Sequence, residues 1–324
     1  MKFEQLKKNL KTQIKPVYLI TGSDLFLKQK AENLIKQAVV STNAELNTAI
    51  FSTDNLQPDK VIDACNTLPF FANRKLVIVK EYDKKQSDSF VKTLEEYSKQ
   101  PNDTTCLLLI ANDNSKYFNP LKKHVEIVDC NVLSTKLVET FVDAELKKHN
   151  KSIEYIAKKF LIDYCNFNLS KINIELLKLI SYLGEKESIT AQMVKDNVNK
   201  TLDFQIYELT NALGEKNSQK AYVILNKLIA SKNTTSTLLA IIYKHFRRLF
   251  YISVSKGLSN YELAEKLSVK EFAIKKASEQ VSAFGARKLK QINELCVDID
   301  YKIKSGKLNA ESSLDFFMFS ILNI

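Results

Sequence analysis

The feature that most constrains the fold of this sequence is a change of hydrophobic pattern near residue 133. Before it, short runs of β-branched and aliphatic residues alternate with segments whose apolar residues recur at helical spacing. After it, helical spacing continues throughout the chain. Alternating strands and helices predict a parallel sheet with helices on both faces, and the later pattern predicts all-α structure. The expected fold class is therefore α/β plus all-α.

Five segments of the first part have the composition of strands. The segment 106–111 is nearly all apolar, as a central parallel strand buried on both faces should be. The segments are 17–21, 49–52, 76–79, 106–111 and 125–128. Between them we expect helices, the first capped by Asp24, the second with Pro58 in its first turn and the third near 89–98.

The second part divides into helices by its caps and glycines. Ser134 can cap a helix that runs to about residue 149, and a second helix is expected over 153–164. In the third, 170–183, Ile174, Leu177 and Ile180 are predicted along one side, and Gly184 ends it. Further helices are expected over 190–200, 235–256 and 289–304, with a domain boundary near 200–205 where Asp203 caps the next helix.

Composition indicates a folded protein with a basic C-terminal part. The chain has 324 residues and a net charge of +11, of which about +7 falls after residue 204. Such an excess suggests nearby nucleic acid, although a solvated lysine-rich surface is the commoner cause. The five cysteines are odd in number and widely spaced, which favours reduced core thiols of a cytosolic protein. We expect neither a signal peptide nor a membrane span.

The sequence gives little support to catalysis. The loop that follows the first strand, 22–29, lies where a P-loop would bind phosphates, but Gly22 is its only glycine and Leu25, Phe26 and Leu27 fill the space. We therefore expect no ATP binding, although Lys28 could still touch a phosphate. The three histidines lack metal-ligand spacing. No catalytic residue, cofactor or metal is predicted.

The most informative stretch is the short connection before the third strand. Pro69 disfavours helical geometry at Leu68, so the preceding helix should end there. Phe70 and Phe71 then lie on a turn, and two adjacent side chains of a turn do not easily both point inward. One or both rings are candidates for an exposed aromatic plug. The alternative is that both rings pack under the sheet edge as core, since most phenylalanines are buried.

Three segments in the same order resemble the delta subunit of the bacterial DNA polymerase III clamp loader. They are 16–27, which is similar to the family's strand and degenerate nucleotide loop, 68–77, similar to its clamp-contacting turn, and 238–259, similar to its collar helix. The segment 170–184 also resembles a helix of the family's lid. The resemblance covers nearly the whole chain.

The resemblance implies an AAA+-like α/β domain without a working P-loop over 1–132, a helical lid over 133–203 and a helical collar bundle over 204–324. It implies a non-catalytic, cytoplasmic subunit whose hydrophobic turn enters a pocket of the beta sliding clamp and opens the ring for loading onto primed DNA. Its other partners would be the gamma/tau and delta-prime subunits. The implied clamp-binding residues are Leu68, Pro69, Phe70, Phe71, Ala72, Asn73 and Arg74. A Leu-Phe pair is familiar in this family, so Phe70 is a departure.

Two other functions compete with this hypothesis. The segment 258–280 has the pattern of two short helices joined by a turn, as in a helix-turn-helix, which would suit a DNA-binding regulator. Its second helix, however, lacks the Arg, Asn and Gln side chains that read bases. The alternative interpretation is that the same segment forms two packed helices of the bundle with no DNA-binding role. A cryptic nucleotide-hydrolysing enzyme is disfavoured by the loop near Gly22.

Overall fold

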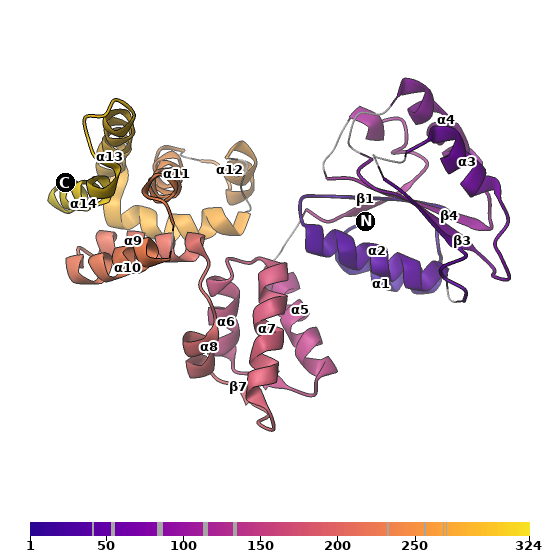
Figure 1. Cartoon of the computed structure of the whole chain (residues 1–324), viewed down its shortest axis with the longest axis horizontal. Helices are drawn as coiled ribbons and strands as arrows, with labels where there is room; N and C mark the ends of the chain where they lie inside the picture. The colour runs from indigo at the N-terminus through magenta and orange to yellow at the C-terminus, as the bar shows by residue number, and fades with distance from the viewer. Residues whose placement is uncertain are drawn as a thin grey trace. The chain divides into compact units, whose positions relative to one another are not determined.

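The computed structural model of the chain forms two compact units, Met1–Leu133 and Ser134–Ile324, and Figure 1 labels their elements. The structure describes residues 1–40, 42–52, 56–82, 87–112, 116–131, 135–231, 233–255, 257–267, 269 and 271–324. Each unit is described by itself.

The first unit is built on a parallel five-stranded sheet with the order β2-β3-β4-β1-β5. The strands are β1 (Val17–Thr21), β2 (Thr48–Phe51), β3 (Lys75–Val79), β4 (Thr105–Ile110) and β5 (Glu126–Asp129). All residues of β1 and β3 are buried, as the apolar runs predicted for central strands. The strand predictions are each correct to within one residue at either end.

Helices cover both faces of this sheet (Figure 1). They are α1 (Phe3–Thr12), α2 (Leu25–Val39), α3 (Pro58–Asn66) and α4 (Asp88–Lys99), with a 3-10 turn at Lys116–Phe118. Asp24 caps α2 and Pro58 starts α3, as predicted. The helix α1 was not predicted, because Leu6 is its one buried residue and its sequence is otherwise polar. The predicted fold class, an α/β unit with a parallel sheet followed by helical structure, is confirmed.

The second unit begins with helices and a minimal two-stranded sheet, and Figure 1 shows the strand β7 (Ser188–Ile189) at one end of these helices. They are α5 (Thr135–Lys148), α6 (Tyr155–Tyr164), α7 (Leu169–Leu183) and α8 (Ala191–Asn197). Two strands of two residues, β6 (Ser152–Ile153) and β7 (Ser188–Ile189), pair in parallel. The prediction of helix alone after residue 134 is therefore wrong here, and the helix expected from residue 153 starts at Tyr155. The cap predicted at Ser134 lies outside the described residues.

The apolar side noted for α7 in the sequence is not the side that the helix buries. Ile174 is 63% and Leu177 39% exposed. The residues that α7 buries are Leu169, Ile172, Leu176, Leu179 and Leu183. This helix has apolar residues on more than one side, and the leucine-rich side packs inward. Gly184 ends α7 with a positive φ of 56°, so that part of the prediction holds.

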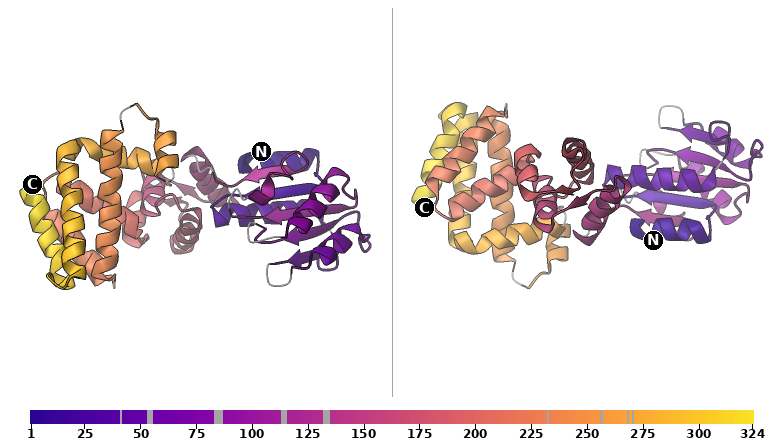
Figure 2. Two further views of the ribbon diagram at one scale, coloured as in Figure 1. Left: turned by 90° about the horizontal axis from the view of Figure 1, so that it is seen from above. Right: turned by 90° about the horizontal axis from the view of Figure 1, so that it is seen from below.

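Six helices complete the unit and pack as a bundle, drawn from orange to yellow in Figure 2. They are α9 (Leu202–Gly214), α10 (Ser218–Ala230), α11 (Thr235–Val254), α12 (Asn260–Lys266), α13 (Glu271–Lys304) and α14 (Ala310–Asn323). Thr201, and not the predicted Asp203, caps α9, since its hydroxyl accepts from the Phe204 N–H. The helix expected over 289–304 is the second half of α13, which is divided by a kink at Gly285, a residue without helical φ and ψ. The division of this unit into 133–203 and 204–324 stays a prediction.

Candidate functional site

The turn between α3 and β3 presents its large apolar side chains to solvent. Leu68 is 74%, Phe70 54% and Phe71 83% exposed. The helix α3 ends at Asn66, two residues before Leu68, and β3 starts at Lys75. The alternative in which both rings pack under the sheet edge is therefore wrong. Exposed neighbouring aromatic side chains on a soluble protein are typical of a docking site.

The two rings form one compact apolar unit. Their centroids are 4.6 Å apart, and the planes meet at 85°, an edge-to-face pair. Phe71 has a φ of 47°, which is the left-handed region that a residue with a bulky side chain rarely adopts. The turn therefore holds an exposed aromatic in a strained backbone conformation. Strain of this kind is concentrated at functional sites.

Asn47, which directly precedes β2, fixes the backbone of the turn. Its Oδ1 accepts a hydrogen bond from the Phe70 N–H at 2.7 Å, and its Nδ2 donates to the Phe70 carbonyl oxygen at 2.9 Å. The side chain is buried, and the Asn47 carbonyl accepts from the Leu76 N–H at 2.8 Å. Asn47 thus ties the turn to the start of β3. Sequence reasoning missed this residue, because a contact across 23 positions leaves no local pattern.

Arg74, at the end of the turn, points back into the unit. It is half-buried, and its Nη1 donates to the Ile14 carbonyl oxygen at 3.3 Å. The guanidinium therefore braces the loop. Among the other predicted residues, Pro69 and Ala72 are half-buried, and Asn73 is exposed. The structure places all seven predicted residues on one short surface turn.

The loop after β1 uses its own side chains where a P-loop would hold phosphates. The Asp24 carboxylate accepts from the Phe26 and Leu27 N–H groups, each at 3.1 Å, so an anion of the protein already caps α2. The Lys28 ammonium is buried and donates to the carbonyl oxygen of Ala111 at 3.3 Å and to the side chain of Asn112. These groups are therefore engaged within the chain.

Gly22 is required at this loop by a close approach of two backbones. Its φ is 131°, and a Cβ built on it would lie 2.5 Å from the carbonyl carbon of Cys130. Any side chain here would push the loop away from the end of β5. The glycine therefore closes the loop onto β5, whereas the glycines of a P-loop open a space for phosphate.

Metal and thiol chemistry find no support in the described part of the chain. No group of three or more His, Cys, Asp or Glu side chains there could hold a metal ion. All five cysteines are buried and unpaired, and burial raises their pKa values to about 12. The prediction of reduced core thiols is confirmed.

Within the described residues, no helix has the length and apolar character to cross a membrane.

The segment that suggested a helix-turn-helix is part of the bundle. Leu263 and Ala264 of α12 pack against Ile274 of α13 in one buried cluster. Burial of these side chains is expected if the two helices are packed members of the bundle. Within the described residues of this segment, nothing supports a DNA-binding regulator.

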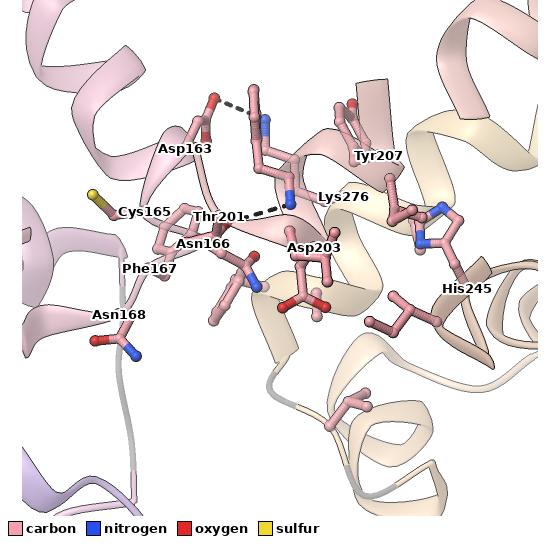
Figure 3. A pocket seen from close by; sticks show the side chains of 18 of the residues that line it. Asp163, Cys165, Asn166, Phe167, Asn168, Thr201, Asp203, Tyr207, His245 and Lys276 are labelled. Carbon is pink, nitrogen blue, oxygen red and sulfur yellow. Dashed lines mark hydrogen bonds and ion pairs between the residues drawn. The ribbon is translucent and has the colours of Figure 1, made fainter. Parts of the chain in front are cut away.

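A cavity of about 420 Å³ lies among α7, α9, α11 and α13 of the second unit (Figure 3). Asp163 and Lys276 of its lining form an ion pair at 3.1 Å. His245, which also lines it, is hydrogen-bonded to Gln280. These three groups are therefore engaged within the chain.

The fold and the turn together define the class: a protein with a parallel-sheet α/β unit whose loop after β1 is filled by its own side chains, an exposed hydrophobic turn and a C-terminal helical unit. Two family models match the chain. "DNA polymerase III, delta subunit" matches residues 18–131, and "DNA polymerase III delta subunit, C-terminal domain" matches 203–321. The chain belongs to the family of DNA polymerase III delta subunits.

Individual relatives agree with this assignment. DNA polymerase III subunit delta of Bacillus subtilis is 28% identical over 99% of this chain and 97% of the relative. The subunit of the same name from Escherichia coli is 21% identical over 69% of this chain and 67% of its own. Among solved structures, the DNA clamp loader delta protein of Bacillus subtilis superposes with a TM-score of 0.74 at 27% identity, covering 99% of this chain and 100% of that one.

Proposed function

We propose that this clamp-loader delta subunit binds the beta sliding clamp through the turn 68–74 and opens the ring for loading onto primed DNA. The observation that carries the proposal is the exposed pair of Phe70 and Phe71, held on a braced turn of a rigid α/β unit. Contiguous exposed apolar side chains mark interaction sites on protein surfaces, whereas single exposed ones are common. Both rings are free to enter an apolar pocket of another protein.

The turn can contribute binding free energy while losing little conformational entropy when it binds. Burying one aromatic side chain contributes about 1.5–3 kcal/mol, and a few central aromatic anchors dominate many interfaces. The Asn47 amide and the Arg74 guanidinium hold the backbone before the clamp arrives. A pre-ordered turn avoids the entropic cost of ordering during association.

Opening the ring requires a preference for one state of the clamp. A ligand that binds the open and closed rings equally shifts no population, however tightly it binds. We infer that the two rings anchor the subunit while the surface of the α/β unit fits the opened interface alone. The departure from a Leu-Phe pair at Phe70 then tunes the fit to the clamp pocket rather than the mode of binding.

The subunit contributes binding and no nucleotide chemistry in this proposal. The Asp24 carboxylate occupies the N–H groups that would hold a phosphate, and a second anion there would be repelled. ATP hydrolysis would then come from the gamma/tau subunits of a cytoplasmic assembly that also holds delta-prime and meets primed DNA. Titration of the purified chain with a fluorescent nucleotide should show no binding, and micromolar affinity would overturn this part.

The decisive experiment removes both rings. The Phe70→Ala/Phe71→Ala variant should keep the wild-type thermal midpoint, because neither ring is buried, and should lose measurable binding to the cognate clamp in a surface-immobilised assay. The matched control is Tyr182→Ala/Phe319→Ala, which removes two aromatic side chains that are 67% and 66% exposed elsewhere. Unchanged clamp affinity of the Phe70/Phe71 variant, or equal loss in the control, would refute the assignment.

Ring opening is tested separately from binding. A donor and an acceptor fluorophore placed across one clamp interface report its separation as a loss of energy transfer. Wild-type subunit should lower the transfer, and the Phe70→Ala/Phe71→Ala variant should not. Binding without any change of transfer would leave the turn as a docking site and would contradict the opening step.

A further inference from the structure

Few large apolar side chains of the first unit are exposed, and most of them lie at one edge of its sheet. Among the described residues of this unit they are Leu25, Leu46, Ile50, Leu68, Phe70 and Phe71. The turn 68–74 directly precedes β3, and Leu46 lies two residues before β2. Because β2 and β3 are neighbouring parallel strands, both segments lie at the amino edge of the sheet. Leu25 follows β1 and therefore lies at the opposite, carboxyl edge.

Asn47 ties the segment of Leu46 to the turn. Its Nδ2 donates to the Phe70 carbonyl oxygen at 2.9 Å and to the Asn43 carbonyl oxygen at 3.2 Å. The same Asn43 oxygen accepts from the N–H groups of Leu46 and Asn47, each at 3.1 Å. One buried amide therefore holds the two chain segments side by side. The Cα atom of Leu46 is only about 3.8 Å from that of the residue that contacts Phe70.

The exposure of Leu46 resembles that of the turn itself. Leu46 is 67% exposed, and Leu68 is 74% exposed. A single exposed leucine is common on a protein surface, whereas contiguous apolar side chains mark an interaction site. Leu46 lies beside a turn that already presents three large apolar side chains to solvent, so it extends their patch toward β2.

The turn 68–74 alone is too small for a complete interface. One side of a stable interface covers about 800 Å² and includes about 20–30 residues. A partner that receives the rings of Phe70 and Phe71 must therefore also cover the surface next to them. On one side of the turn this surface is the polar, exposed end of α3 at Asn66. On the side of β2 it includes Leu46, which is the apolar neighbour.

We propose that Leu46 is a third apolar anchor of the clamp contact, beside Phe70 and Phe71. This inference rests on the proposed function and extends the same site from the turn before β3 to the turn before β2. The ligand of Leu46 is an apolar part of the clamp surface next to the pocket that receives the rings. Aromatic side chains dominate binding more often than leucine does, so Leu46 contributes less to affinity than the two rings.

Clamp binding by Leu46→Asp and Leu25→Asp tests the proposal. Both variants replace an exposed leucine, at 67% and 71%, and both add one negative charge, but they do so at opposite edges of the sheet. Leu46→Asp should lower clamp affinity at least about thirtyfold, because the carboxylate would lose its hydration in the contact. Leu25→Asp should bind within about twofold of wild type, as a surface substitution away from the contact. The thermal midpoint should not fall in either variant.

A conservative variant and a direct probe distinguish contact from positioning through Asn47. Leu46→Met keeps an apolar side chain of similar volume and should bind within about threefold of wild type. In an Asn47→Ala background, Leu46→Asp should still lower clamp affinity, because a direct contact does not act through the amide. A photo-crosslinking amino acid at position 46 should attach to the clamp on irradiation, and the same amino acid at position 25 should not.

The variants separate failure of this inference from failure of the proposed function. Loss of clamp binding in Phe70→Ala/Phe71→Ala, with wild-type binding of Leu46→Asp, would leave the proposed function intact and overturn the role of Leu46. Wild-type binding of both variants would overturn both. Equal losses in Leu46→Asp and Leu25→Asp would reduce the effect to charge. Disappearance of the Leu46 effect in the Asn47→Ala background would make Leu46 a positioning residue, and either of these last two results also overturns the proposal.

Discussion

The side-chain amide of Asn47 holds Phe70 by both of its backbone polar groups. Its oxygen accepts from the Phe70 N–H at 2.7 Å, and its nitrogen donates to the Phe70 carbonyl oxygen at 2.9 Å. No side chain other than an amide offers an acceptor and a donor side by side in this way. The rings that we propose as the clamp anchor therefore depend on a buried residue that lies outside the turn.

Asn47→Ala should weaken clamp binding although both rings remain. Phe70 would lose two hydrogen bonds, which lowers the free energy of unfolding by about 1–3 kcal/mol and lets the turn sample other conformations. Clamp affinity should fall about tenfold, because binding must then order the turn at a free-energy cost of about 1.4 kcal/mol. Urea denaturation and a clamp binding titration measure the two effects.

Asn66→Ala, at an exposed position of α3 close to the turn, is the control and should change neither quantity. A double-mutant cycle with Phe70→Ala separates positioning from general destabilisation. If Asn47 acts through Phe70, its effect on affinity should shrink when that ring is already absent. Strict additivity, or an unchanged affinity for Asn47→Ala alone, would contradict the positioning role.

Phe71 should reveal a conflict between stability and binding. Its φ of 47° disfavours any residue with a Cβ by about 1–2 kcal/mol relative to glycine. Phe71→Gly should therefore have a higher free energy of unfolding than Phe71→Ala, by about 1 kcal/mol. Both variants lack the ring, and both should lose clamp affinity.

Thermal or urea denaturation of the two variants provides the measurement, with wild type as reference. The comparison of glycine with alanine isolates the backbone, since both lack the ring that is 83% exposed. An alanine variant as stable as the glycine variant would show that the turn relaxes to a negative φ. In that case the strained conformation is no fixed feature of the site.

Sequence patterns predicted the sheet well because the side chains on both faces of its central strands lie in the same apolar interior. Cys106 to Ile110 is an unbroken apolar run, and it is buried on both faces as β4. The turn was located because Pro69 limits how far α3 can extend. These inferences depend on residues that are adjacent in sequence.

The errors come from choices made by tertiary packing. On α7, Ile174 and Leu177 form an apolar side as regular as the leucines that are buried, so periodicity alone does not select between them. The strands β6 and β7 have two residues each, too few for an alternating pattern. The contact between Asn47 and Phe70 spans 23 positions and appears only when β2 and β3 are paired.

Gly22 and Gly285 should respond differently to alanine, although both have a positive φ. A Cβ at Gly22 would lie 2.5 Å from the backbone carbon of Cys130, whereas a Cβ at Gly285 would meet nothing within 4 Å. Gly285→Ala should cost about 1–3 kcal/mol, because its φ of 72° and ψ of 158° lie in a backbone region that is populated essentially by glycine alone. Gly22→Ala should cost several kcal/mol in addition, since backbone atoms must separate. Urea denaturation measures both, and equal destabilisation would show that the loop after β1 shifts freely.

His245 should make the second unit less stable in mild acid. Burial lowers its pKa from 6.5 to about 4, with a further lowering by Arg248, against the opposing effect of its hydrogen bond to Gln280. Gln280 Nε2 donates to the Tyr207 carbonyl and to Asn211 Oδ1, so its Oε1 accepts, and His245 must donate from a neutral Nε2–H. Between pH 6.5 and 4 the unfolded chain binds a proton that the folded chain does not. The free energy of unfolding therefore falls as the pH falls through this window.

The His245→Gln variant removes the titration and keeps an N–H donor facing Gln280. Wild type should lose about 2 kcal/mol more than this variant between pH 7.5 and pH 5.0, because each pH unit below 6.5 contributes about 1.4 kcal/mol. Urea denaturation followed by circular dichroism at both pH values measures the difference. His149→Gln removes an exposed imidazole and serves as the control. Parallel losses in wild type and His245→Gln would mean that the folded chain binds a proton at His245 as readily as the unfolded chain does, so that burial of this ring would not make the second unit sensitive to acid.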